Sequence, residues 1–263
     1  MSETGDRNDA PARPGRPADV GRTAPLSFAQ QRLWLLDRLY PGEATYNEAI
    51  AVRIAGALDA DALRRALNEV LRRHEALRTR FVVEDARPVQ IVAPALAVAL
   101  DVEDLGALPE ADRAAEARRR ARDERDAPFD LARGPLVRAR LLRLAADEHW
   151  LFVTMHHIVT DGWSTGVLGH ELGALYGAFR EGRPSPLPGL AIQYADYAAS
   201  QREEPDGDAC TLALAWWKDA LAGLPSLDLP ADRPRAPIAS HEGRCRTFEI
   251  GRASCRERVL YTV

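Results

Sequence analysis

The apolar segment HWLFVTMHH (residues 149–157) ends in two adjacent histidines and constrains the fold more than any other part of the chain. The segment GPLVRARLLRL (134–144) precedes it, and only four residues lie between the two. Two apolar runs joined by so short a loop predict an antiparallel β-hairpin. The stretch that follows the histidines, WSTGVLGHELGALYGAFREG (163–182), predicts a helix that ends at Gly182.

Helices and strands are predicted in mixed order along the rest of the chain. In the segment 26–42, Ser27 can cap a helix, Gln30 completes a capping box, and Phe28 and Leu39 are among the apolar residues expected to pack. Further helices are expected at 58–74, 109–129, 190–203 and 210–225, and further strands at 46–56, 75–83, 88–94 and 95–105. This order predicts an α/β (α+β) fold in which a central mixed sheet is flanked by helices.

Composition excludes several classes of protein. The net charge is −4, from 35 basic and 39 acidic residues, so the chain as a whole has no excess of positive charge for nucleic acid. Charged residues interrupt every apolar run before the ~18 residues that a membrane span needs. Residues 1–24 lack the apolar core of a signal peptide and predict a disordered leader. Three scattered cysteines indicate a reducing compartment, and we expect a cytoplasmic protein.

The two histidines can belong to a catalytic site, to a metal site or to a well-packed turn. On a strand, His156 and His157 point to opposite faces, so one can enter the core while the other faces a cleft. Imidazole, whose ordinary pKa is about 6.5, can accept and return a proton at neutral pH. Asp161 can cap the next helix or pair with an arginine, and Gly162 allows a sharp turn close to a ligand. No pattern supplies a third metal ligand, so we expect no metal.

Four motifs in sequence order narrow these alternatives. They are LSFAQQRLWLLDRL (26–39), RRHEALRTRF (72–81), MHHIVTDGWS (155–164) and YADYAASQRE (194–203). Together they resemble the successive core motifs of the condensation domains of nonribosomal peptide synthetases. The third resembles the HHxxxDG signature of that family, which is complete here as His156, His157, Asp161 and Gly162. The resemblance extends from about Pro25 to Phe248.

The resemblance implies a role for each signature residue. The family forms a peptide bond between a donor aminoacyl or peptidyl thioester and the amine of an acceptor aminoacyl thioester. His157 matches the histidine assigned as catalytic, whereas His156 and Asp161 match positions that mainly shape the loop. The reaction does not require a strong base, and His157 can orient the amine, accept its proton or stabilise charge. These three roles stay open.

Other residues are implied as supports of the site. Arg73 and Arg78 lie in the second motif and are candidates for supporting the site, and the sequence does not identify the arginine that would pair with Asp161. Trp163 and Ser164 extend the signature in the way of the subtype that joins two L-configured residues.

The resemblance also implies substrates and partners. Both thioesters are carried on the phosphopantetheine arms of donor and acceptor carrier proteins, beside an adenylation domain, and no cofactor is bound. We expect neither nucleic acid nor a membrane as a partner. Two alternatives remain: a free-standing acyltransferase that uses the same histidine on a diffusible acceptor, and a non-catalytic docking module for carrier proteins.

The expected domain organisation follows the family. Its domain has two lobes that are similar to chloramphenicol acetyltransferase and surround a tunnel. Residues 25–190 match the N-terminal lobe, and 191–248 match the helices and linker that lead to a C-terminal lobe missing here. Residues 249–263 do not resemble the family and are expected to be an artefact of the sequence end. We therefore expect the chain to be inactive by itself.

Overall fold

A computed structural model describes residues 21–203, 208–225, 227 and 230. The chain divides into two units, residues 1–215 and residues 216–263. Within the described residues, both sheets and helices α1 to α5 belong to the first unit, and the division falls inside helix α6 (Asp208–Ala220). All contacts described below lie within the first unit.

The larger sheet has four strands in the order β2-β7-β6-β5. Their bounds are Asn47–Ala55 for β2, Asp101–Asp104 for β5, Val137–Ala145 for β6 and Glu148–His156 for β7. Strands β6 and β7 form the predicted antiparallel hairpin, and β2 pairs antiparallel with β7. Strand β5 runs parallel to β6, which confirms the predicted mixed sheet.

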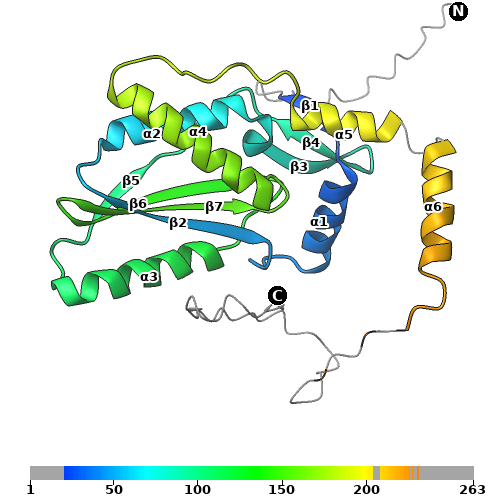
Figure 1. The fold of residues 1–263 in the computed structure, drawn as a ribbon, viewed down its shortest axis with the longest axis horizontal. Coiled ribbons are helices and arrows are strands. Elements are labelled where there is room, and N and C mark those ends of the chain that lie inside the picture. Colours follow the sequence, from blue (N-terminus) through cyan, green and yellow to red (C-terminus); the bar gives the residue numbers. More distant parts are fainter. Residues whose placement is uncertain (1–20, 204–207, 226, 228–229, 231–263) are drawn as a thin grey trace, which may run out of the picture. The chain divides into compact units, whose positions relative to one another are not determined.

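Helices cover both faces of this sheet (Figure 1). Helices α2 (Ala60–Arg73) and α4 (Gly162–Arg180) lie on one face, and α3 (Glu110–Asp126) lies on the other. Neighbouring residues of β6 pack on opposite faces of the sheet. Leu141 packs in the core under α2 and α4, whereas Leu142 packs under α3. Burying a leucine of this kind stabilises the fold by about 1.5–3 kcal/mol.

A second, antiparallel sheet has the order β1-β4-β3 and was not predicted as a separate sheet. Its strands are β1 (Arg22–Pro25), β3 (Thr79–Glu84) and β4 (Arg87–Val92). Residues 22–24, which the sequence placed in a disordered leader, thus belong to a strand that pairs with β4. Residues Glu75–Arg78 form a 3₁₀ helix, η1, instead of the start of the predicted strand.

Helix α1 (Phe28–Leu39) begins with the predicted capping box, in which Ser27 and Gln30 exchange side-chain and backbone hydrogen bonds. The packing predicted for two of its apolar residues is wrong: Phe28 is 50% exposed and Leu39 is 61% exposed. The reason is that α1 lies at the edge of the fold and packs along one narrow side, where Gln30 is its buried residue. Helical periodicity identifies an apolar face without showing how much of it a neighbour covers.

Several expected segments lie wholly or mostly outside the described residues. They are residues 1–20 of the leader, most of the linker after residue 225, and the tail 249–263. Among the described helices, none combines the length and apolar character that crossing a bilayer requires.

A buried ion pair joins α2 to α4. The Arg73 guanidinium donates two hydrogen bonds to the Glu171 carboxylate, at 3.2 and 3.1 Å, and His74 Nε2 lies 2.8 Å from the same carboxylate. Arg73 and Glu171 are both buried. Burial raises the pKa of Glu171, but the hydrogen bonds to Arg73 and His74 outweigh it, so the pKa lies below the ordinary value of 4.5. The carboxylate is therefore charged at neutral pH.

We expect Glu171→Ala to lower the free energy of unfolding by about 3–5 kcal/mol at pH 7, because it leaves the Arg73 charge buried without a partner. Because the folded-state pKa is lowered, this difference is present at neutral pH and shrinks as the pH falls through the folded pKa. Urea unfolding at several pH values measures it. The control is Glu181→Ala, which removes an exposed contact with Arg183 and should stay within ~0.5 kcal/mol of the parent. Equal losses in both variants would contradict a special role of the buried pair.

Candidate active site

The two histidines at the end of β7 occupy opposite faces of the sheet. The odd-numbered residues Leu151, Val153 and Met155 pack in the core under α2 and α4. The even-numbered residues therefore face α3, and His156 continues that set. His157 follows the strand on the side of Met155, as the sequence predicted. Its backbone N–H donates to the carbonyl of Tyr46 at 2.8 Å, which ties the turn to the start of β2.

His156 is 4% exposed and lies between aromatic rings. The ring centroids of Tyr46 and Phe129 are each 6.4 Å from its own. Its Nδ1 accepts a hydrogen bond of 3.1 Å from the backbone N–H of Ile158. Burial, with a smaller effect of the His157 charge, lowers the pKa of His156 to about 4. The ring is therefore neutral at pH 7, and its contacts hold the turn that carries His157.

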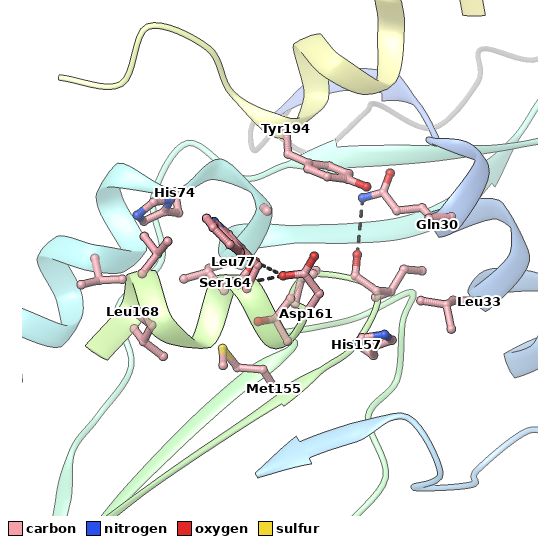
Figure 2. A pocket seen from close by; sticks show the side chains of 18 residues that line it. Gln30, Leu33, His74, Leu77, Met155, His157, Asp161, Ser164, Leu168 and Tyr194 are labelled. Atoms are coloured by element: carbon pink, nitrogen blue, oxygen red, sulfur yellow. Dashed lines mark hydrogen bonds between the residues drawn. The ribbon is translucent and has the colours of Figure 1, made fainter. Parts of the chain in front are cut away.

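His157 lies on the wall of a cavity of about 410 Å³. Its side chain is 38% exposed, and its Nδ1 lies 2.5 Å from Oε1 of Glu48, at ion-pair distance but without the alignment of a hydrogen bond. Sequence analysis missed Glu48, because a strand residue across the sheet from Met155 carries no motif. Figure 2 shows His157 beside Met155 and Leu33 at the cavity.

The cavity lies between α1, the 72–78 region, the turn after β7 and the start of α4 (Figure 2). Its walls are mostly apolar. The apolar lining residues are Ala29, Leu33, Val70, Ala76, Leu77, Met155, Ile158, Val159, Trp163, Val167 and Leu168. The polar lining residues are Gln30, His74, His157, Thr160, Asp161, Ser164 and Tyr194. Three of these polar residues, Gln30, His74 and Tyr194, belong to the other three sequence motifs, so the fold brings all four motifs to one cavity.

Asp161 caps helix α4. Its Oδ1 accepts hydrogen bonds from the backbone N–H of Ser164, at 2.7 Å, and from the Ser164 hydroxyl, at 2.6 Å. These hydrogen bonds lower the pKa of Asp161, and the His157 charge adds to the effect. Of the two predicted roles for Asp161, the cap is therefore present. In the part of the chain that the structure describes, no arginine forms an ion pair with Asp161.

Gly162 does not make the predicted sharp turn. It is the first residue of α4, its φ is not positive, and a Cβ at this position would meet nothing within 4 Å. The Asp161 cap already turns the chain into the helix, so the backbone needs no glycine there. Gly162 also lies outside the lining of the cavity, whereas its neighbour Trp163 lines the cavity and is 85% exposed.

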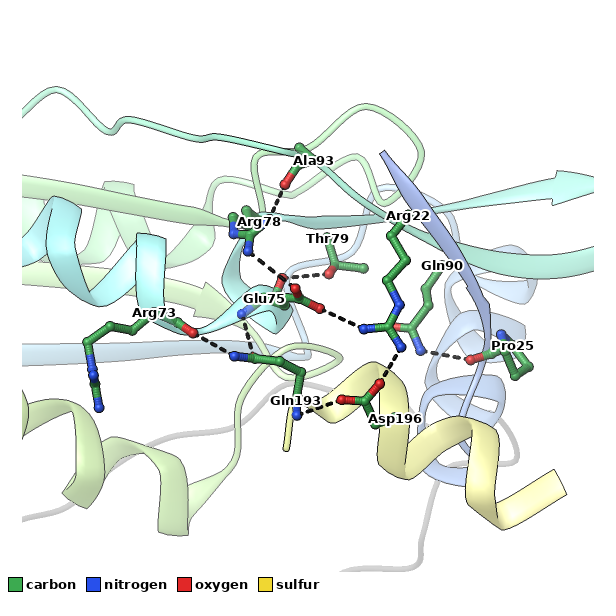
Figure 3. A network of polar contacts seen from close by, with 10 residues as sticks. All are labelled: Arg22, Pro25, Arg73, Glu75, Arg78, Thr79, Gln90, Ala93, Gln193 and Asp196. Carbon is green, nitrogen blue, oxygen red and sulfur yellow. Dashed lines mark hydrogen bonds and ion pairs between the residues drawn. The ribbon is translucent and has the colours of Figure 1, made fainter. Parts of the chain in front are cut away.

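Arg73 and Arg78, which the resemblance implied as supports of the site, do not line the cavity. Arg73 holds α2 to α4, as described above, and donates to the carbonyl of Pro188 at 2.7 Å. Arg78 contacts the carbonyl of Ala93 and Oε1 of Glu75, which links η1 to the residue that follows β4 (Figure 3). Both arginines thus position the segment that carries His74 and Leu77.

The same network fastens the fourth motif to the second. The side-chain N–H of Gln193 donates to the carbonyl of Arg73 at 2.9 Å, and its side-chain oxygen accepts from the backbone N–H of Glu75 at 3.1 Å. Arg22 of β1 contacts both Glu75 and Asp196 (Figure 3). Helix α5 (Tyr194–Glu203) is therefore held where Tyr194 reaches the cavity. Among the described residues, no group of three His, Cys, Asp or Glu side chains is arranged for a metal ion.

The lowered pKa of His156 predicts a loss of stability in acid. The folded state keeps this ring neutral down to about pH 4, whereas the unfolded chain protonates it near 6.5, so the free energy of unfolding falls as the pH falls between these values. The loss is on the order of 3 kcal/mol. In His156→Asn, which keeps an acceptor for Ile158 N–H but cannot titrate, this component should vanish from pH-dependent urea unfolding. Persistence of the full loss in the variant would show that other groups cause it.

Removal of the α4 cap gives a second stability prediction. We expect Asp161→Ala to lower the free energy of unfolding by about 1 kcal/mol, because the Ser164 N–H loses its acceptor. Asp161→Asn keeps an acceptor oxygen and should recover most of the loss. Thermal and urea unfolding of the three proteins measure both effects. If Asp161→Ala unfolds like the parent, the cap contributes nothing and the role assigned from geometry is wrong.

Comparison with known proteins shows which family shares this architecture. A family model described as "Condensation domain" matches residues 20–259. Phosphinothricin tripeptide synthetase PhsB of Streptomyces viridochromogenes is 46% identical over 249 residues, which cover 93% of this chain and 21% of that protein. Chondramide synthase cmdD of Chondromyces crocatus is 44% identical over 247 residues, 94% of this chain and 6% of that protein.

Solved structures give the same result. The starter condensation domain of rhizomide synthetase RzmA matches with a TM-score of 0.69 and 27% identity, over 77% of this chain and 48% of that one. The first condensation domain of the CDA synthetase matches with a TM-score of 0.69 and 26% identity, over 78% and 51%. The chain thus spans about half of the solved domains and a small part of the synthetases. By these matches, and as its four motifs indicated, the chain belongs to the condensation-domain family of the nonribosomal peptide synthetases.

Proposed function

We propose that the chain supplies the His157 side of a site that forms a peptide bond between two carrier-bound thioesters. The donor is an aminoacyl or peptidyl thioester, and the acceptor is the α-amine of a second aminoacyl thioester. One observation carries the proposal: His157 is the signature histidine whose ring is open to the cavity, whereas His156 is buried and neutral. The cavity also gathers residues from all four family motifs.

The reaction requires mainly that the protein position the two reactants. The acceptor amine attacks the donor carbonyl carbon and forms a C–N bond, the C–S bond breaks, and the thiol leaves with a proton. His157 can accept the proton that the amine loses and return it to the departing sulfur. Because a thioester is already activated, alignment of the two reactants provides most of the acceleration. The mostly apolar walls around His157 would help to keep water from such a pair once the cavity is closed.

The proposed partners follow from the substrates. Donor and acceptor carrier proteins would each deliver a thioester on a phosphopantetheine arm, and an adenylation domain would load the acceptor. The arms are substrates, so the chain itself needs no resident cofactor. We propose the cytoplasm as the compartment, because the three cysteines show neither metal-type spacing nor the pattern of a disulfide framework.

The coverage of the solved domains leads to a prediction about activity. Because the chain spans about half of a solved condensation domain, we propose that the cavity needs the other half as its second wall. We expect the 263-residue chain to form no dipeptidyl-carrier product above background. A chimaera that adds the C-terminal half of a related condensation domain should form it, and His157→Ala in the chimaera should slow it by about 100-fold or more. Mass spectrometry of the carrier proteins measures the product.

Controls separate the alternatives. His170→Ala changes an exposed histidine of α4 that does not line the cavity, so it should leave the chimaera's rate unchanged. Equal turnover with a small diffusible amine would favour a free-standing acyltransferase, and binding of carriers without turnover would favour a docking module. Product formation by the short chain at a rate close to that of the chimaera would show that one half is sufficient.

A further inference from the structure

The position of Glu48 relative to His157 is set by the backbone of the sheet. Glu48 of β2 lies directly opposite Met155 of β7, and residues opposite each other in an antiparallel pair share a face. Its neighbour Asn47 faces the other way, where its side chain donates to the carbonyls of Arg125 and Ala127 at the end of α3. The alternation of β2 therefore directs Glu48 to the face on which His157 lies.

Within the described part of the chain, no cationic side chain competes with His157 for the Glu48 carboxylate. The Glu48 side chain is 27% exposed, and its Oε1 lies 2.5 Å from Nδ1 of His157. Among the described residues, no arginine or lysine forms an ion pair with Glu48. The terminal torsion of Glu48 is soft, so reorienting the carboxylate toward Nδ1 costs little energy. Glu48 does not line the cavity, so it approaches the imidazole from outside it.

The family signature leaves the positioning of His157 open. Asp161, the acidic residue of the signature, is engaged by Ser164 as the cap of α4. A neutral imidazole carries its proton on one nitrogen, and the partner of Nδ1 decides which one. A carboxylate beside Nδ1 favours the proton there, which leaves the lone pair of Nε2 free.

We propose that Glu48 is a positioning residue that holds His157 in the Nδ1–H tautomer, with Nε2 as the nitrogen that accepts the proton of the acceptor amine. The consequence for catalysis rests on the function proposed above, but the tautomer does not. When Nε2 takes up the proton, the Glu48 carboxylate also stabilises the positive charge of the ring. A carboxylate that is a mere surface neighbour would favour the charged ring without selecting a tautomer of the neutral one.

Nitrogen NMR tests the tautomer in the 263-residue chain. With ¹⁵N-labelled histidine at alkaline pH, the His157 signals, assigned by their loss in His157→Asn, should show a protonated Nδ1 and an unprotonated Nε2. In Glu48→Ala, the ratio of the two tautomers should shift toward Nε2–H by about tenfold, because a hydrogen bond to a charged group is lost. Glu48→Gln retains an acceptor oxygen and should keep most of the parent ratio. The control Glu148→Ala removes an ion pair with Arg53 at the other end of β2 and β7, and should leave the His157 signals unchanged.

The outcomes are decisive in either direction. An Nε2–H majority in the parent overturns the proposal, even if Glu48→Ala does not fold, and so does an unchanged ratio in a folded Glu48→Ala. In the chimaera, Glu48→Ala should lower kcat by about tenfold with little change in KM, and Glu48→Gln should lower it less. A parent in the Nδ1–H form whose chimaera has no activity would leave Glu48 as the partner of His157 and would overturn the proposed function instead.

Discussion

Strand β7 is covered on both faces, so most of its side chains are buried on one or the other side of the sheet. Leu151, Val153 and Met155 fill the core under α2 and α4, and Phe152 fills the core under α3. A shift of one residue would exchange these faces, which makes the register costly to change. The same alternation between the two faces continues through His156 and His157. Hydrophobic packing along β7 thus decides which imidazole is buried and which one meets the cavity.

Helix α4 forms one wall of the cavity, and polar contacts hold it in place. Asp161 caps its first turn, and Glu171, in its third turn, is held by Arg73 of α2. Because both contacts use charged groups, a change of charge at either carboxylate would weaken the contacts that hold this wall. The signature aspartate therefore acts on the shape of the site through the backbone of α4. The acidic side chain that contacts His157 comes instead from β2, where Glu48 lies.

The lining of the cavity fits the proposed function, in which positioning of the substrates provides most of the acceleration. This lining is mostly apolar, and its polar groups come from four separate parts of the chain. The network of Arg22, Glu75, Gln193 and Asp196 ties the second and fourth motifs to each other and to β1, the strand that leads into the first motif (Figure 3). Polar support of this kind suits the alignment of two tethered reactants that the proposed function requires.

The sequence by itself determined the mixed α/β class, the β6–β7 hairpin, the cap at Ser27 and the family, because these depend on local periodicity, turn length and motif. It did not predict the second sheet, the exposure of much of α1, or the conformation at Gly162. Only the tertiary structure chose the cap over an ion pair for Asp161 and placed Glu48 beside His157. The physical reason is that Glu48 and His157 are 109 positions apart in sequence and meet through the pairing of β2 with β7, a long-range register that no local pattern encodes.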